Sequence, residues 1–266
     1  MHASCLRRPS SRARDGHWLL AALLAALLAC AFSCSAGNLQ VAPIVLEFSE
    51  NQQANALWLQ NTADHPINAQ IRIQQWSQAT ASDQLEPSQA LRASPAIVQI
   101  PPGQRQLVRI VRPTPLPTAP AQYEQAYRIW VDELPQISEN QPAGLQFLLR
   151  YSIPAFVLPN GAQPREQIAK APVDTSALQA SWQLSADALI LDVRNTGNQR
   201  VRLSELGWTA DNGAITPLQR GLLGYVLAGQ RMQWKLPLAT RLPLPGHLQA
   251  RLNDAPAAQI LPSAIH

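Results

Sequence analysis

Two runs in this chain decide the fold: Tyr127-Arg128-Ile129-Trp130-Val131-Asp132-Glu133-Leu134-Pro135 and Leu145-Gln146-Phe147-Leu148-Leu149-Arg150-Tyr151-Ser152-Ile153-Pro154-Ala155-Phe156. Both are rich in β-branched and aromatic residues, and the loop between them contains proline and glycine, so they predict an antiparallel pair of strands. Alternate residues of a strand share a face, which places Leu145, Phe147 and Leu149 in one apolar row. Leu148, on the other face, is expected in the core.

The rest of the chain after residue 37 is also dominated by strand patterns. No helical periodicity of comparable strength occurs there. Together with residues 145–157, the runs make seven strands, which is typical of an immunoglobulin-like β-sandwich. We therefore predict an all-β fold with a first domain at residues 37–160. The other six runs are residues 41–48, 56–60, 69–76, 96–100, 106–111 and 128–133.

A second β-rich region begins near residue 170, after a linker that contains Pro159, Asn160, Gly161 and Pro164. It also carries an internal echo of the first region. Leu57-Trp58-Leu59-Gln60-Asn61-Thr62 and Leu191-Asp192-Val193-Arg194-Asn195-Thr196 both lead a strand into an Asn-Thr turn. The echo predicts two similar sandwiches, the second at residues 161–266, with a cleft between them.

The first 36 residues have the composition of a secretory signal. Four arginines precede the apolar run at residues 18–32, and Cys34-Ser35-Ala36 offers the small residues of a cleavage site. That run is shorter than the about 20 residues of a membrane span. We therefore expect cleavage after Ala36, with a lipid-modified Cys30 as the alternative. Cleavage would remove all three cysteines and lower the formal net charge from +4 to +1, which argues against nucleic acid as a partner.

The sequence does not offer a catalytic or metal-binding set. His65, His247 and His266 lack the spacing of metal ligands or of a paired nucleophile. Asp132 and Glu133 are neighbours on a predicted strand and point to opposite faces, which is unsuited to a shared acid-base task. The glycines are not grouped as a phosphate loop requires. We predict a protein that is not an enzyme and that uses no cofactor or metal.

The tryptophan content leaves a second class of function open. Aromatic faces stack on sugars, so a secreted carbohydrate-binding or adhesin-type β-sandwich module is one candidate function. Trp58, Trp76 and Trp130 alternate with aliphatic residues on predicted strands, and we expect them in the sandwich core. A β-sandwich hydrolase is a third interpretation, without a catalytic set to support it.

The two opening runs resemble the periplasmic pilus-assembly chaperones of the chaperone-usher pathway. The shared patterns are YRxxxxELP, from Tyr127 to Pro135, and LQFxxRYSIPxF, from Leu145 to Phe156, and the RYSIP form is similar to the archaic branch. The resemblance implies two immunoglobulin-like domains in a boomerang arrangement and a location in the periplasm. It also implies that the protein binds, folds and caps pilus subunits and delivers them to the outer-membrane usher, without stable membrane insertion.

The same resemblance assigns a role to the apolar row. A pilus subunit is similar to an immunoglobulin fold that lacks its last strand, so its core is an open groove. Leu145, Phe147 and Leu149 match the chaperone strand that fills this groove by donor-strand complementation. Each side chain would contribute about 1.5 to 3 kcal/mol if it were fully buried.

The resemblance further implies a site for the C-terminal carboxylate of the subunit. In the conventional branch of this chaperone family, an arginine in the first strand and a lysine in the last strand bind the carboxylate. Alignment through Phe48 and Phe156 places Val45 and Pro154 at those positions of this chain. An arginine elsewhere is therefore expected, because its guanidinium can grip a carboxylate with two hydrogen bonds. The candidates, in order, are Arg128, Arg150 and Arg109.

Overall fold

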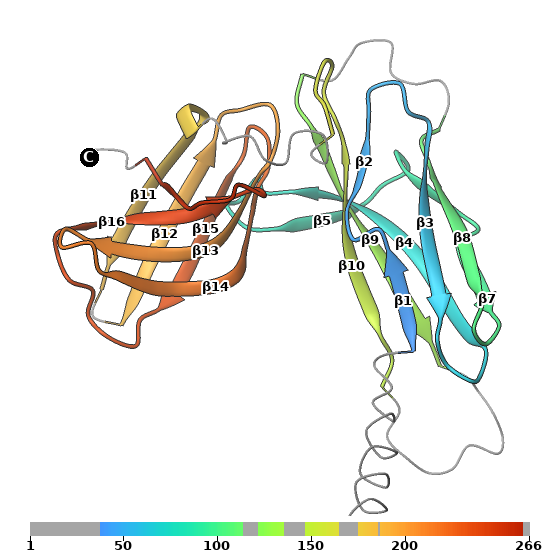
Figure 1. Ribbon diagram of the computed structural model, residues 1–266. Helices are drawn as coiled ribbons and strands as arrows, with labels where there is room; N and C mark the ends of the chain where they lie inside the picture. Colours follow the sequence, from blue (N-terminus) through green and yellow to red (C-terminus); the bar gives the residue numbers. More distant parts are fainter. Residues whose placement is uncertain (1–37, 114–121, 136–146, 165–174, 186, 263–266) are drawn as a thin grey trace, which may run out of the picture. The chain divides into compact units, whose positions relative to one another are not determined.

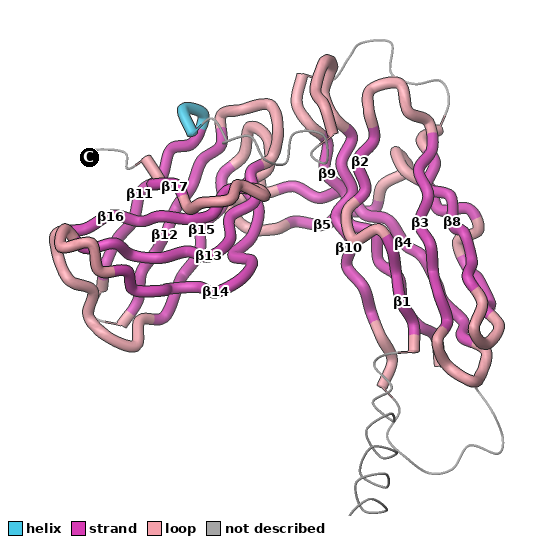
Figure 2. The backbone as a smooth tube through the Cα atoms, viewed as in Figure 1, coloured by secondary structure: helices cyan, strands magenta, loops and turns pink. Residues whose placement is uncertain are grey.

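The computed structural model describes residues 38–113, 122–135, 147–164, 175–185 and 187–262 (Figure 1). Strands make up most of this part of the chain, and one short 3-10 helix, η1 (Thr175–Ala177), interrupts them (Figure 2). The predicted all-β fold is confirmed. Within the described residues, no helix has the length and apolar character needed to cross a membrane. The predicted signal peptide, residues 1–36, and Leu145 lie outside the described residues.

The first sandwich is built from two sheets. One has the strand order β1-β3-β8-β6, and the other has the order β2-β10-β9-β4-β5 with β7 also paired to β4. Side chains alternate between the two faces along β3 and β8, which places Leu57, Leu59, Val108 and Ile110 in the core between the sheets. The strands are β1 (Leu39–Ala42), β2 (Leu46–Phe48), β3 (Ala54–Asn61), β4 (Ile67–Ser77), β5 (Gln84–Pro87), β6 (Arg92–Ser94), β7 (Ile97–Ile100), β8 (Arg105–Val111), β9 (Gln125–Leu134) and β10 (Arg150–Val157).

The predicted strand at residues 41–48 is instead two strands in different sheets. β1 pairs with β3, whereas β2 runs parallel to β10. Pro43, which follows a cis peptide bond, separates them. Proline has no N–H to donate, so a ladder cannot continue through this position. The chain therefore passes from one sheet to the other and brings β2 beside the end of β10.

The last strand of the first sandwich is shorter than predicted. β10 begins at Arg150, and Phe147 and Leu148 precede it with 79% and 42% of their surfaces exposed. The expectation that Leu148 lies in the core is wrong. Leu149 packs against the core instead, because its carbonyl accepts a hydrogen bond from the Glu133 N–H (2.9 Å) and so extends the pairing with β9 by one residue.

The second sandwich also has two sheets, with the orders β11-β12-β15 and β14-β13-β16-β17. Trp208 is fully buried between them and meets Trp182 edge to face at 5.0 Å between ring centres. The strands are β11 (Leu178–Leu184), β12 (Ala188–Asn195), β13 (Val201–Ala210), β14 (Ile215–Val226), β15 (Arg231–Pro237), β16 (Gly246–Leu252) and β17 (Gln259–Ile260).

The two Asn-Thr turns of the sequence echo are built alike. Asn61 accepts a hydrogen bond from the Ala63 N–H and donates to the carbonyls of His65 and Ile100. Asn195 repeats this pattern in the second sandwich, and its two nearby partners lie at the same spacing along the chain. It accepts from the Gly197 N–H and donates to the carbonyls of Gln199 and Val226. Both side chains are buried, so each amide satisfies backbone groups that water cannot reach.

We predict that Asn195→Ala lowers the free energy of unfolding by about 1 to 3 kcal/mol, because it leaves buried backbone groups without partners. Chemical denaturation followed by circular dichroism measures the loss. Asn198→Ala, in the exposed part of the same turn, is the matched control and should change little. Equal effects of the two substitutions would contradict a structural role for the Asn195 amide.

Candidate functional site

The candidate residues of β9 and β10 lie on the outward face of their sheet. The register pairs Arg128 with Pro154 and Asp132 with Arg150. Residues opposite each other share a face, and so do residues two apart on one strand. Ile129, between these positions, is buried in the core. Arg128, Asp132, Arg150 and Pro154 therefore all point away from the core of the first sandwich.

Arg128 is half-buried and lacks an ion pair with any described residue. The guanidinium carbon lies 3.8 Å from the ring centre of Trp76 and 5.9 Å from that of Tyr225. Burial lowers the pKa of Arg128, while the charge of Asp83 and the Tyr225 side chain act in the opposite direction. An arginine stays charged under such conditions. Arg128 is thus a partly desolvated cation whose hydrogen-bond donors remain available to an anion.

Arg128 rests on a buried aromatic cluster. Trp76, Phe156 and Tyr225 have ring centres 5.5 to 6.1 Å apart. Trp76 and Phe156 belong to β4 and β10, and Tyr225 belongs to β14 of the second sandwich. Because the rings fix one face of the guanidinium, the cluster restricts the directions in which its N–H groups can point.

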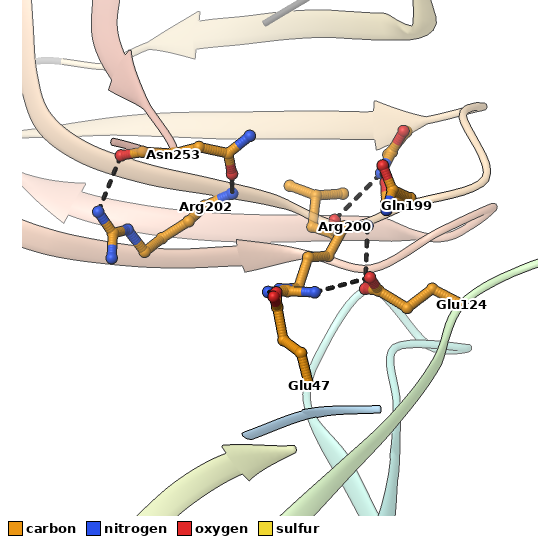
Figure 3. Close-up of polar contacts among 8 residues, drawn as sticks. Glu47, Glu124, Gln199, Arg200, Arg202 and Asn253 are labelled. Carbon is orange, nitrogen blue, oxygen red and sulfur yellow. Dashed lines mark hydrogen bonds and ion pairs between the residues drawn. The ribbon is translucent and has the colours of Figure 1, made fainter. Parts of the chain in front are cut away.

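A second arginine near this cluster is already neutralised. Arg200 donates from Nη1 to Glu124 Oε2 (2.6 Å) and from Nη2 to Glu47 (Figure 3). Its guanidinium carbon lies 3.5 Å from the ring centre of Phe156. All three charged side chains are largely buried. Two carboxylates therefore compensate this cation, and it holds β2 and the segment before β9 to the second sandwich.

Arg150 also has an anionic partner, which it shares with Arg72. Asp132 accepts hydrogen bonds from Arg150 and, at 2.7 and 2.9 Å, from Arg72 on β4. Burial alone would raise the pKa of Asp132, but the hydrogen bonds and charges of the two arginines outweigh it and hold the pKa below its usual range. The Arg150 side chain is 61% exposed, so it retains access to solvent.

The three candidate arginines are not brought together. Arg150 lies opposite Asp132, four residues along β9 from Arg128, which is about 13 Å at the usual rise of a strand. Arg109 is exposed on β8, opposite Ala56 and Ser94, and so belongs to the other sheet. Sequence reasoning could not separate them, because each is a single cation inside an apolar run. No pattern in the sequence indicated that Arg200 pairs with Glu47 and Glu124.

A cavity of about 630 Å³ lies beside β2. Val45, which the alignment through Phe48 and Phe156 places at the conventional arginine position, lines it, but Arg128 does not. The expectation that Trp58 and Trp130 lie in the core is wrong: Trp58 lines this cavity and is 36% exposed, and Trp130 is partly exposed on the outward face of the other sheet. Trp76 is buried, but in the aromatic cluster rather than between the two sheets. Among the described residues, no group of His, Cys, Asp and Glu side chains could hold a metal ion.

Comparison with known families supplies the decisive observation. Residues 38–163 match the model of the pili and flagellar-assembly chaperone family, PapD N-terminal domain. The first sandwich belongs to this chaperone family. The predicted relationship to pilus-assembly chaperones is thereby confirmed. No curated protein sequence matches the chain.

Solved structures of pilus chaperones resemble the chain over both sandwiches. The CsuC-CsuE chaperone and tip adhesion subunit complex, from archaic chaperone-usher Csu pili of Acinetobacter baumannii, matches with a TM-score of 0.63 and 24% identity, covering 85% of this chain and 98% of that one. The YadV chaperone matches with a TM-score of 0.57 and 16% identity, covering 84% of this chain and 98% of that one. The Salmonella enterica SafA pilin in complex with the SafB chaperone matches with a TM-score of 0.55 and 17% identity, covering 85% of this chain and 95% of that one. At these identities the likeness establishes the fold.

The Asp132 ion pairs predict a pH dependence of chaperone stability. Because the pKa of Asp132 is lowered in the folded state, its contribution is present above the unfolded pKa of about 3.9 and is lost as the pH falls through the folded value. Asp132→Asn should therefore destabilise the protein at pH 7 and flatten the loss of stability below about pH 4. Urea denaturation across pH measures this, with Asp211→Asn at an exposed turn as the control. If Asp132→Asn lost stability below about pH 4 as steeply as the wild type, the Asp132 ion pairs would make no such contribution to stability.

Proposed function

We propose that this protein is a periplasmic chaperone that binds pilus subunits by donor-strand complementation and delivers them to the outer-membrane usher. The family match of the first sandwich and the fold of both sandwiches support a chaperone in pilus assembly. The secretory signal at residues 1–36, the domain limits 37–160 and 161–266, membership of the archaic branch and the usher as a partner form part of this proposal. A binding protein of this kind needs no catalytic group.

The observation that carries the proposal is the open edge of β10. Its whole length pairs with β9 on one side, but on the other side β2 covers only Ala155 to Val157. From Arg150 to Pro154, the outer edge has no strand partner among the described residues. An open edge of this kind can pair with a strand of another chain. The backbone of β10 would thus form the ladder, and side chains near it would enter the subunit groove.

Phe147 supports the position of the groove contacts. It lies just before the open edge, and its side chain is 79% exposed. When a partner covers a large exposed apolar side chain, the burial of its surface contributes to the free energy of binding. Leu149 is half-buried against the chaperone's own core, so its share of the subunit contact would be smaller than that of Phe147.

Arg128 supports an anchor for the subunit carboxylate. It lies directly opposite Pro154, the position that carries the lysine in the conventional branch, and on the same face. Its guanidinium can therefore reach the region that the missing lysine would serve. Its lack of an ion pair among the described residues distinguishes it from Arg150 and Arg200. Arg109 also lacks an ion pair among the described residues, but it lies on the other sheet. We therefore place Arg128 first among the three candidates.

The alternative of a carbohydrate-binding module finds less support. Sugar-binding sites commonly present aromatic faces together, whereas Trp58 and Trp130 lie on different sheets of the first sandwich. Trp76 and Trp208 are buried. Trp182 and Trp234 pack against the core of the second sandwich. The tryptophans therefore do not form a shared exposed platform in the described part of the chain.

Phe147→Asp should abolish recovery of a co-expressed pilus subunit, because a carboxylate would have to enter an apolar groove. The chaperone itself should keep its circular dichroism spectrum and unfolding midpoint, since Phe147 is exposed. Co-purification from the periplasm measures the yield. Leu222→Asp, at an exposed leucine of the second sandwich, is the control, and a normal yield with Phe147→Asp would exclude this residue from the groove contact.

Arg128→Ala should weaken the complex with a subunit by about 2 to 5 kcal/mol, as expected when one partner of a buried charge pair is truncated. Lysine should restore only part of the loss, because it lacks the two-pronged geometry. Arg220→Ala, at an exposed arginine of the second sandwich, is the control. Isothermal titration measures the affinities.

A subunit extended beyond its natural C-terminus tests the contact itself. Extension should weaken binding to the wild type but add little to the loss caused by Arg128→Ala, since both remove one interaction. Losses that simply add would show that Arg128 does not contact the carboxylate, and Arg150 would become the residue to test.

A further inference from the structure

The outward face of the other sheet of the first sandwich carries three exposed arginines. Arg105 and Arg109 lie on β8, and Arg92 lies on β6. The register places Arg109 opposite Ala56 and Arg92 opposite Val111. Val108 and Ile110, at the alternate positions of β8, are buried, so the arginines point away from the core.

Trp58 and Leu107 lie between these cations. They are opposite each other on β3 and β8, and Trp58 is 36% exposed. The guanidinium carbon of Arg105 lies 4.6 Å from the ring centre of Trp58. Exposed tryptophan and arginine are the side chains most often found at the energetic centre of protein interfaces. We call the surface formed by Arg92, Arg105, Arg109, Trp58 and Leu107 the basic face.

The outward positions of β3, β6 and β8, which form the basic face, carry no acidic side chain. These positions also carry alanine, glutamine and serine, as at Ala56, Gln60 and Ser94, and the three arginines form no ion pair with a described residue. Five arginines elsewhere in the described part of the chain do have a carboxylate partner, namely Arg72, Arg150, Arg200, Arg202 and Arg231. The cations of the basic face are therefore an uncompensated local charge in a protein of low net charge.

We propose that the basic face binds an acidic segment of another protein. Arg105 and Arg109 are four residues apart on one strand, so their Cα atoms are separated by about 13 Å. An extended segment with carboxylates four residues apart would match this spacing. The residue midway between them would lie over Leu107 and Trp58 and can be apolar. Each guanidinium can donate two hydrogen bonds to one carboxylate.

A lipid surface suits this face less well than an acidic segment. Recognition of anionic lipid by basic clusters takes about four to eight lysines or arginines, and this face has three. The site also differs from the open edge of β10, because it lies on the opposite sheet. A chaperone that uses both could hold a subunit and a second, acidic partner at the same time.

Binding of a defined peptide by the full chain tests the proposal. The probe is fluorescein-labelled Glu-Thr-Val-Thr-Glu-Thr-Val-Thr-Glu, and the comparison peptide has glutamine in place of glutamate. Fluorescence anisotropy at low salt should show binding of the acidic peptide and at least tenfold weaker binding of the glutamine peptide. The triple variant Arg92→Gln, Arg105→Gln, Arg109→Gln should lose at least tenfold in affinity, and Trp58→Ala should lose affinity as well.

The matched control removes the same number of charges from the second sandwich. Arg220, Arg241 and Arg251 are exposed there, and the variant with glutamine at all three should bind within twofold of the wild type. Equal losses in the two triple variants would overturn the proposal in favour of bulk charge. Binding to phosphatidylglycerol vesicles without binding to the acidic peptide would overturn it in favour of a lipid surface. Circular dichroism and the unfolding midpoint verify that each variant is folded.

Discussion

The passage of the chain from one sheet to the other at Pro43 is the constraint on which the rest of the first sandwich depends. Because Pro43 cannot donate to a ladder, β1 ends at Ala42 and the chain resumes as β2 beside the end of β10. β2 reaches only the last three residues of β10. Open edges promote aggregation unless they are protected, and this one carries Arg150 and Pro154, which disfavour uncontrolled pairing. The same edge is available to a partner strand.

The environments of the arginines separate structural roles from binding roles. Arg200 is buried between Glu47 and Glu124 and joins the two sandwiches. Arg72 and Arg150 share Asp132. Arg128 has an aromatic surface beneath it and forms no ion pair with a described residue. Removing one partner from a buried ion pair destabilises the protein. An unpaired, partly buried cation is instead stabilised when an anion binds to it. This difference favours Arg128 as a binding residue.

The two sheets of the first sandwich offer different surfaces. The sheet with β10 presents an open edge and a cation on aromatic rings, which suits the end of a polypeptide chain. The sheet with β8 presents an outward face with three uncompensated arginines and one exposed tryptophan. The repeated asparagine turns at Asn61 and Asn195 stabilise corresponding positions of both sandwiches. They show that local sequence specifies the turn in the same way in each domain.

The sequence alone determined the all-β class, the pairing of residues 128–133 with the last strand and the Asn-Thr turns, because strand alternation and turn chemistry are local properties. It also carried the family resemblance in YRxxxxELP and RYSIP. Only the tertiary structure decided that residues 41–48 divide between two sheets, that Leu149 rather than Leu148 faces the core, and that Trp58 is exposed. It alone distinguished Arg128, Arg150 and Arg109, because the partner of a charge depends on which strands lie side by side, and neighbouring strands are distant in sequence.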